Sequence, residues 1–381
     1  MSIQPVGCHV KTLFKEKQLD VNKLQQIRDT RHISLSITSK CSLKCPYCVS
    51  NMFLPATQQL ELAIDNLGID EYLKRVLYFA KPYFPNISFN IPGSGEPTES
   101  PYFVRLATEF VKRGAKLNFQ SNLHGIKNIE AFTSQFSKEM IQKQVTATIS
   151  FHCGTYIDAG IRGKELRQLW LYDWLPRCIE TGIKLNTVIV PMTPSVLHNP
   201  NFIKDYEYIL KITRCTPALS ELFHFYNDKH YPDAYTSEET NHLAEIQQYF
   251  HYGHLNLGFN KKILTCMGIP NKTQYLTNYI EVKGFSCASC MGDIEILADG
   301  FIRRCQSIPA ESTIYGNICD PNYEYLPVIL TDNPVICPAN QCLCRSFGIA
   351  YCLQIYGITL DEYYHAWYLD HNKPEVAAYF Q

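Results

Sequence analysis

Apolar and polar positions alternate with two different periods along the first two thirds of the chain. Short stretches with a two-residue period, typical of strands, are followed by longer ones with apolar residues three or four apart, typical of helices. Strands are predicted at 32–38, 87–91, 116–120, 145–151, 184–190 and 219–225, and helices at 58–80, 101–113, 126–143, 165–181, 201–213 and 237–250. Six such units predict an α/β fold with a parallel sheet and outer helices, a partial (β/α)6 barrel of the TIM type.

The pattern changes after residue 252, where the helical period is lost and Tyr, Asn, Gly and Cys become frequent. We therefore predict four regions: an N-terminal extension at 1–30 with a helical piece at 21–29, the barrel at 31–252, a bridging region with a small cysteine-rich module at 253–352, and a C-terminal helix within 353–381. The first thirty residues are too few for an independent peptide-binding domain.

Composition narrows the class of protein. The 381 residues carry a formal net charge of −1, so a polyanion such as nucleic acid is not favoured as a partner. No apolar run approaches membrane-spanning length, and residues 1–20 lack the pattern of a signal peptide, which predicts a cytoplasmic protein without membrane contact. In that compartment, sixteen cysteines favour metal ligation over disulfides.

Three of the cysteines, Cys41, Cys45 and Cys48, form a C-x3-C-x2-C motif directly after the first predicted strand. Active sites of open α/β sheets and barrels lie at this end of the strands. Three neighbouring thiolates can hold three corners of an iron–sulfur cube and leave the fourth iron open. A zinc site is the alternative, although zinc usually takes four protein ligands in structural sites.

The motif resembles the signature of the radical SAM superfamily. That resemblance implies a [4Fe–4S] cluster held by Cys41, Cys45 and Cys48, which reductively cleaves S-adenosylmethionine to methionine and a 5′-deoxyadenosyl radical that abstracts hydrogen from a substrate. It also implies a reductant of the flavodoxin or ferredoxin type.

The resemblance extends to positions at the ends of later strands. Ser94-Gly95-Glu96-Pro97 stands where the family carries Gly-Gly-Glu-Pro, with Ser in place of the first Gly. Binding roles toward S-adenosylmethionine are implied for the adenine neighbour Tyr47, the methionine-amino ligands Gly95 and Glu96, the ribose neighbour Asn122, and the ribose and carboxylate ligands Ser150 and Arg162. For each, an ordinary packing, capping or surface role is the alternative. His152, which follows Ser150 closely, either faces the substrate or is a structural histidine.

The cysteine-rich module begins with a predicted β-hairpin. Cys290 and Cys305 flank two apolar stretches joined by Asp299-Gly300, a strong turn dipeptide. This arrangement resembles the opening of the SPASM and twitch modules, which implies at least one auxiliary [4Fe–4S] cluster. Its predicted ligands are Cys290 and Cys305 with two of Cys337, Cys342 and Cys344. Two alternatives stay open: a second cluster that includes Cys287, Cys319 and Cys352, because the downstream spacing departs from the SPASM pattern, and a structural zinc.

The predicted function is that of a radical SAM enzyme with a SPASM- or twitch-like auxiliary domain, which abstracts hydrogen from a small molecule while the auxiliary cluster assists oxidation or substrate binding. The first alternative is a maturase of a ribosomally made peptide. The second is a non-catalytic iron–sulfur or zinc module for electron transfer or binding. Glu96, Ser150 and Arg162 distinguish the enzyme from the module, because an electron carrier has no need of a pocket for S-adenosylmethionine.

Overall fold

The structure, a computed structural model, describes residues 8–22, 24–25, 31–48, 62–215, 217–220, 222, 224–231, 233–252, 280–281, 284, 286–287, 293–303, 314–326, 334–336, 341–342, 355–358 and 360–370. Among these residues, no helix has both the length and the apolar character needed to cross a membrane.

Six parallel strands, paired in chain order, form the centre of the fold. Their bounds are β1 (Arg31–Leu35), β2 (Ile87–Ile91), β3 (Lys116–Ser121), β4 (Val145–Ser150), β5 (Lys184–Pro191) and β6 (Ala218–Ser220). Sequential parallel pairing is what alternating β/α units produce, so the predicted fold class is confirmed.

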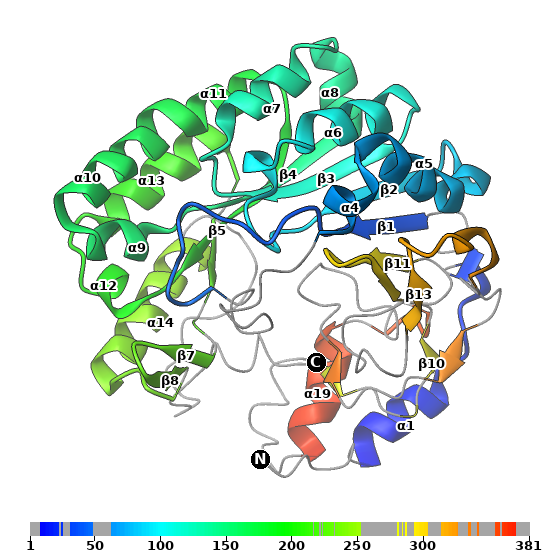
Figure 1. The fold of residues 1–381 in the computed structure, drawn as a ribbon. Helices are drawn as coiled ribbons and strands as arrows, with labels where there is room; N and C mark the ends of the chain where they lie inside the picture. The colour runs from blue at the N-terminus through cyan, green and yellow to red at the C-terminus, as the bar shows by residue number, and fades with distance from the viewer. Residues whose placement is uncertain are drawn as a thin grey trace.

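Helices connect the strands and cover the outer side of the sheet (Figure 1). In chain order they are α4 (Ala63–Leu67), α5 (Ile69–Ala80), η1 (Lys81–Tyr83), η2 (Pro97–Glu99), α6 (Phe103–Lys112), α7 (Ile126–Thr133), α8 (Lys138–Gln144), α9 (Cys153–Asp158), α10 (Gly160–Leu169), the π-helix η3 (Trp170–Trp174), α11 (Leu175–Glu180), α12 (Pro194–Leu197), α13 (Phe202–Thr213) and α14 (Ser237–Tyr252).

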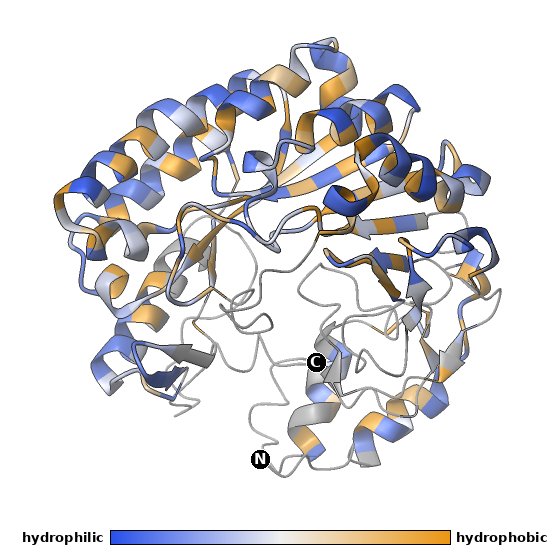
Figure 2. Ribbon diagram, in the orientation of Figure 1, coloured by the Kyte–Doolittle hydropathy of each residue, from blue (hydrophilic) through white to orange (hydrophobic). Residues whose placement is uncertain are grey.

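The two faces of the sheet differ in polarity. Alternate residues on β2, β3 and β4 are buried beneath the helices, and Phe89, for example, stacks on Phe110 of α6 with ring centroids 3.7 Å apart. Figure 2 shows the resulting alternation of apolar and polar residues along the strands. The other face carries a row of neutral polar side chains: Asn118 donates to Asn90 (2.6 Å) and accepts from Thr146 (3.1 Å). The inner face of the sheet is therefore polar where these three residues lie.

Several predicted elements are divided. The helix predicted at 58–80 is broken at Gly68, which has a φ of 73° and separates α4 from α5. The helix predicted at 126–143 is broken where Ser137 caps α8 by accepting from the Met140 N–H. The strand predicted at 219–225 is also divided: its first residues belong to β6, which pairs with the last residues of β5 up to Pro191, and residues 224–225 belong to a separate strand.

Residues beyond β6 form a separate hairpin of β7 (His224–Tyr226) and β8 (Lys229–Tyr231). Asn227 and Asp228 make its two-residue turn with φ values of 48° and 59°, the conformation that Asn and Asp tolerate best among residues other than glycine.

The hairpin predicted around Asp299-Gly300 forms as β11 (Asp293–Ile296) and β12 (Phe301–Arg303), and β13 (Ile314–Asn317) follows it. β11 pairs in parallel with β1, so this part of the cysteine-rich region extends the central sheet to nine strands. The boundary predicted near residue 253 lies outside the described residues, and the four-region division remains a prediction.

The ends of the described chain lie together. α1 (Cys8–Glu16), which the sequence pattern did not predict, meets α19 (Leu360–Asp370), the described part of the predicted C-terminal helix. The Asp370 carboxylate accepts from the backbone N–H groups of His9 (2.8 Å) and Val10 (3.0 Å) at the start of α1. Two further pairs of short antiparallel strands are β9 (Ile280–Glu281) with β15 (Gln341–Cys342) and β10 (Ser286–Cys287) with β14 (Val335–Ile336). A 3-10 helix, η5 (Tyr323–Tyr325), follows β13.

Candidate functional site

The cysteine loop follows β1 at the carboxyl edge of the sheet and lies against the turn after β2. The contact is made by Gly95: a Cβ placed there would lie 2.6 Å from the carbonyl oxygen of Lys40 and 2.9 Å from its nitrogen. The Glu96 N–H donates to the same carbonyl at 2.8 Å. Only glycine allows this approach, which holds the backbone immediately before Cys41 against the second strand end.

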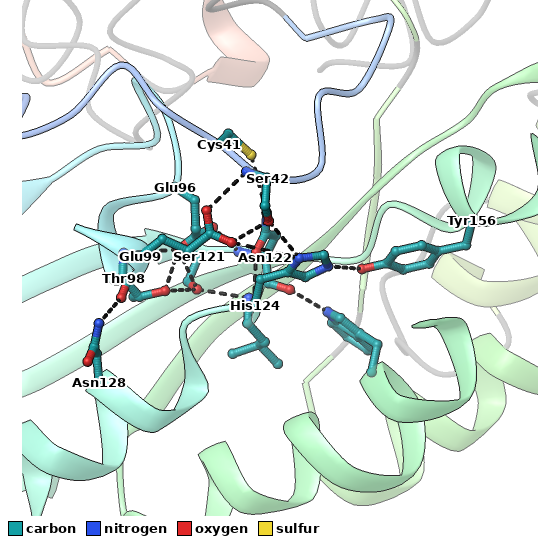
Figure 3. Close-up of polar contacts among 12 residues, drawn as sticks. Cys41, Ser42, Glu96, Thr98, Glu99, Ser121, Asn122, His124, Asn128 and Tyr156 are labelled. Atoms are coloured by element: carbon teal, nitrogen blue, oxygen red, sulfur yellow. Dashed lines mark hydrogen bonds and ion pairs between the residues drawn. The ribbon is translucent and has the colours of Figure 1, made fainter. Parts of the chain in front are cut away.

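The Glu96 carboxylate is buried where the ends of β2 and β3 meet, with 2 % of the residue exposed. One oxygen accepts from the backbone and hydroxyl of Thr98 and from the Ser121 hydroxyl (2.9 Å), and the other accepts from the Asn122 N–H at 2.6 Å. Glu96 thus ties together the turn after β2 and the end of β3 (Figure 3). Among the described residues the second oxygen accepts from this one donor, so it retains capacity for the predicted contact with the amino group of the methionine moiety.

Burial raises the pKa of Glu96 from 4.5 to about 7, although the hydrogen bonds oppose this rise. The folded protein therefore binds the proton more tightly than the unfolded chain does. The resulting stabilisation is complete below about pH 4.5 and is lost as the pH rises through about 7. We expect the unfolding free energy of the cluster-free protein to fall over this interval by on the order of 3 kcal/mol, as measured by urea denaturation at several pH values. Glu96→Gln is the control, and an equally steep slope in that variant would contradict the assignment.

Asn122, directly after β3, faces the cysteine loop. Its Nδ2 donates to the Cys41 sulfur at 3.5 Å, and its Oδ1 accepts from the His124 N–H at 2.9 Å. Its carbonyl oxygen accepts from Nε1 of the buried Trp170 at 2.9 Å. The position predicted to contact ribose therefore already contacts the cysteine motif.

A second group of residues beside Cys41 was missed by sequence reasoning. The backbone N–H of Ser42 donates to Glu99 at 3.0 Å, and its hydroxyl hydrogen-bonds both Glu99 and, at 2.9 Å, Nδ1 of His124. His124 Nε2 lies 3.3 Å from the hydroxyl of Tyr156 (Figure 3). Burial lowers the pKa of His124 and Glu99 opposes this change. These residues carry no motif of their own, and the only signal was their closeness in sequence to Cys41, Glu96 and Asn122.

Tyr47 is buried between the end of β4 and β7. Its hydroxyl accepts from Thr155 at 3.0 Å and lies 3.1 Å from Nδ1 of His152, while its ring packs on Tyr226 with centroids 5.8 Å apart. Burial lowers the pKa of His152 to about 4, so this imidazole is neutral at pH 7. The contact with Tyr47 agrees with the interpretation of His152 as a structural histidine. The adenine contact of Tyr47 remains a prediction.

Ser150 and Arg162 are less engaged than the other predicted ligands. Ser150 ends β4 half-buried, and Arg162 is exposed on α10. Within the described part of the chain, neither side chain has a hydrogen bond or an ion pair, to each other or to another residue. Their predicted contacts with ribose and carboxylate stay predictions.

The three thiols of the motif influence one another. Burial raises the pKa of Cys45 to about 12; the neighbouring Cys41 and Cys48 act in the same direction, whereas the hydroxyl groups of Thr155 and Tyr47 act against it. Three thiolates at this place therefore need a bound cationic centre to compensate their charge. An all-thiolate set in one short loop fits an iron–sulfur cluster. Among the residues described, no three His, Cys, Asp or Glu side chains are grouped so as to hold a metal ion.

Most of the predicted auxiliary ligands, namely Cys290, Cys305, Cys337 and Cys344, lie outside the described residues. Cys342 is described only through its backbone, as the last residue of β15. The predicted auxiliary ligand set is therefore neither supported nor opposed by these positions.

Fold and site together define an α/β protein with a parallel, barrel-type sheet and a three-cysteine loop at its carboxyl edge. No profile of a known protein family matches the chain, and no curated protein sequence is significantly similar to it.

Solved structures with a similar arrangement include SuiB from Streptococcus suis bound to its precursor peptide SuiA (16% identity, TM-score 0.49, covering 82% of this chain and 68% of SuiB). SuiB bound to S-adenosylmethionine gives 16% identity and a TM-score of 0.47 over 82% of this chain and 67% of SuiB. A third is anSMEcpe with bound AdoMet (14% identity, TM-score 0.43, covering 91% and 98%).

Proposed function

We propose that this protein is a radical SAM enzyme that uses a [4Fe–4S] cluster held by Cys41, Cys45 and Cys48. When bound, that cluster supplies the electron that cleaves S-adenosylmethionine and so generates the radical that abstracts hydrogen. The observation that carries the proposal is the placement of the three-cysteine loop against two further strand ends through Gly95, Glu96 and Asn122.

The chain's own residues would bind and orient the reactants. The half-buried strand-end backbone beside Gly95 and the remaining capacity of Glu96 suit the amino group of the methionine moiety, which carries N–H donors. Arg162 suits a carboxylate, because a guanidinium donates paired hydrogen bonds to it. Ser150 offers a hydroxyl at the end of β4, where a ribose could be held.

We propose a polar small molecule as the substrate. Support comes from the inner face of the sheet, where Asn90, Asn118 and Thr146 present neutral hydrogen-bonding groups rather than an apolar lining. We also propose an auxiliary cluster at the hairpin of β11 and β12, because Cys290 and Cys305 flank this antiparallel pair in the sequence.

The test is anaerobic reconstitution of the full chain followed by iron and sulfide analysis, then incubation with dithionite and S-adenosylmethionine. About eight irons per chain are expected for two clusters. A count of about four would contradict the proposed auxiliary cluster. Formation of 5′-deoxyadenosine is expected, because the cluster held by the cysteine loop would cleave S-adenosylmethionine bound by the neighbouring residues. A fully loaded protein that neither binds nor cleaves S-adenosylmethionine would overturn the enzyme proposal in favour of an electron carrier. Consumption of a ribosomal peptide in place of small molecules would overturn the substrate proposal.

A further inference from the structure

The side-chain amide of Asn122 lies against the sulfur of Cys41, across one intervening strand of the sheet. Nδ2 of Asn122 is 3.5 Å from the Cys41 Sγ, an ordinary length for an N–H···S hydrogen bond (Figure 3). Asn122 is the first residue after β3, and Cys41 lies in the loop after β1. The contact therefore joins the carboxyl ends of two separate strands.

The hydrogen-bond partners of Asn122 fix which atom of the amide faces the sulfur. Its Oδ1 accepts from the backbone N–H of His124 at 2.9 Å, a group that can only donate. The amide nitrogen is therefore the atom on the opposite side, toward Cys41. Turning the amide over would place two donors against each other at His124 and remove the only N–H that faces the sulfur from this side chain.

The backbone of Asn122 is held from two further directions. Its N–H donates to the buried carboxylate of Glu96 at 2.6 Å, and its carbonyl accepts from the indole of Trp170 at 2.9 Å. Asn122 is 4 % exposed and Trp170 is fully buried. Trp170 begins the π-helix η3, and Trp174, which ends it, packs on His124 with ring centroids 4.8 Å apart. The segment that carries the amide is therefore rigidly supported.

Backbone groups of the cysteine loop itself also act on the Cys41 sulfur. The backbone groups of Leu43 and Lys44 also favour the Cys41 thiolate, and Lys44 has a left-handed φ of 48°. The sulfur of Cys45 is different, because the groups that favour its thiolate are the hydroxyl groups of Thr155 and Tyr47. Asn122 is thus a side-chain N–H donor to Cys41 that comes from outside the loop.

We propose that Asn122 is a positioning residue that donates an N–H···S bond to the Cys41 ligand and thereby raises the reduction potential of the cluster. The proposal rests on the function proposed above, since it requires the cluster. Hydrogen bonds to ligand sulfurs withdraw electron density and favour the reduced state, which carries more negative charge. The same bond also fixes the first ligand of the loop relative to β3.

Two substitutions separate the hydrogen bond from other effects. Asn122→Asp keeps an oxygen for the His124 N–H but loses the donor and adds a charge, whereas Asn122→Leu loses the donor without adding charge. Asn128→Asp is the matched control, because Asn128 Nδ2 donates to the Thr98 carbonyl at 2.7 Å in the same neighbourhood and not to a sulfur. The measurements use the reconstituted full-length protein. The EPR signal that changes when S-adenosylmethionine is added belongs to the cluster of the cysteine loop, and this is the signal that is followed.

The midpoint potential of this cluster is measured by an EPR-monitored redox titration. We expect it to shift to more negative values in both Asn122 variants and to stay unchanged in Asn128→Asp. Wild-type potentials in both Asn122 variants, or a shift in the Asp variant alone, would overturn the hydrogen-bond role. Should neither variant fold, asparagine labelled with 15N in its side-chain amide is introduced into the wild-type protein. A 15N coupling to the reduced cluster then supports the contact, and its absence overturns it. A wild-type protein that takes up no iron would overturn the proposed function as well.

Discussion

Replacing Cys45 by Ala is expected to abolish the formation of 5′-deoxyadenosine and to lower the iron content by about four atoms per chain. Cys45 is the buried middle cysteine of the motif and a proposed ligand, and Cys41 and Cys48 both raise the pKa of its thiol. Without it, two thiolates remain, too few to hold a cube whose fourth iron must stay open. The measurement combines iron and sulfide analysis with chromatographic detection of deoxyadenosine after incubation with dithionite and S-adenosylmethionine.

The matched control for this prediction is Cys178→Ala. Cys178 is equally buried but lies within α11, away from the motif, and its pKa is raised by burial alone. The control is expected to keep its iron and its activity. Unchanged deoxyadenosine formation in Cys45→Ala would remove the motif from the proposed chemistry, and equal losses in both variants would indicate a folding effect.

Replacing Gly95 by Ala is expected to lower the unfolding free energy by about 2 kcal/mol and to slow deoxyadenosine formation by about a hundredfold. The added methyl group would lie 2.6 Å from the Lys40 carbonyl oxygen and 2.9 Å from the carbonyl carbon of Ser39. Both atoms belong to the backbone that leads into Cys41, so the loop itself must move. Urea denaturation of the cluster-free protein and the initial rate of the reconstituted protein measure the two effects.

Gly93→Ala supplies the comparison two residues away in the same turn. Its new methyl group would meet first the Oε1 of Gln120 at 3.1 Å, which is the end of a flexible side chain that can shift by a few tenths of an ångström. We expect stability and rate close to those of the wild type. If Gly95→Ala behaved like Gly93→Ala, the close approach of the two turns would have no role in placing the loop.

The order of strands and helices could be predicted from the sequence because it is a local property. Residues such as Ile87, Phe89 and Ile91 alternate with polar neighbours, and each helix carries its own apolar stripe, so the period is legible within a dozen residues. Element ends were harder. A single Gly68 or Ser137 divides a helix whose apolar period continues on both sides.

The position of the cysteine loop was predictable for a related reason. The motif follows the first strand directly, and a loop at the carboxyl end of a parallel strand can lie at only one edge of the sheet. The glycine and glutamate after the second strand, and the asparagine after the third, belong to the same edge by the same rule. Their proximity to Cys41 is thus a consequence of topology, and the structure shows Glu96 and Asn122 in contact there.

The contacts that make this edge a site were decided by the tertiary structure alone. Ser42 meets Glu99 and His124 across 57 and 82 residues of chain. α1 meets α19 through a hydrogen bond that spans 361 residues. No local period encodes such pairs.

From the sequence alone follow the α/β alternation and a cysteine motif at the end of the first strand. Which atoms that motif meets depends on how the strand ends pack. The donors to Glu96 and the direction of the Asn122 amide are set by backbone and side-chain groups from separate parts of the chain, and only the packed sheet brings these groups within hydrogen-bonding distance.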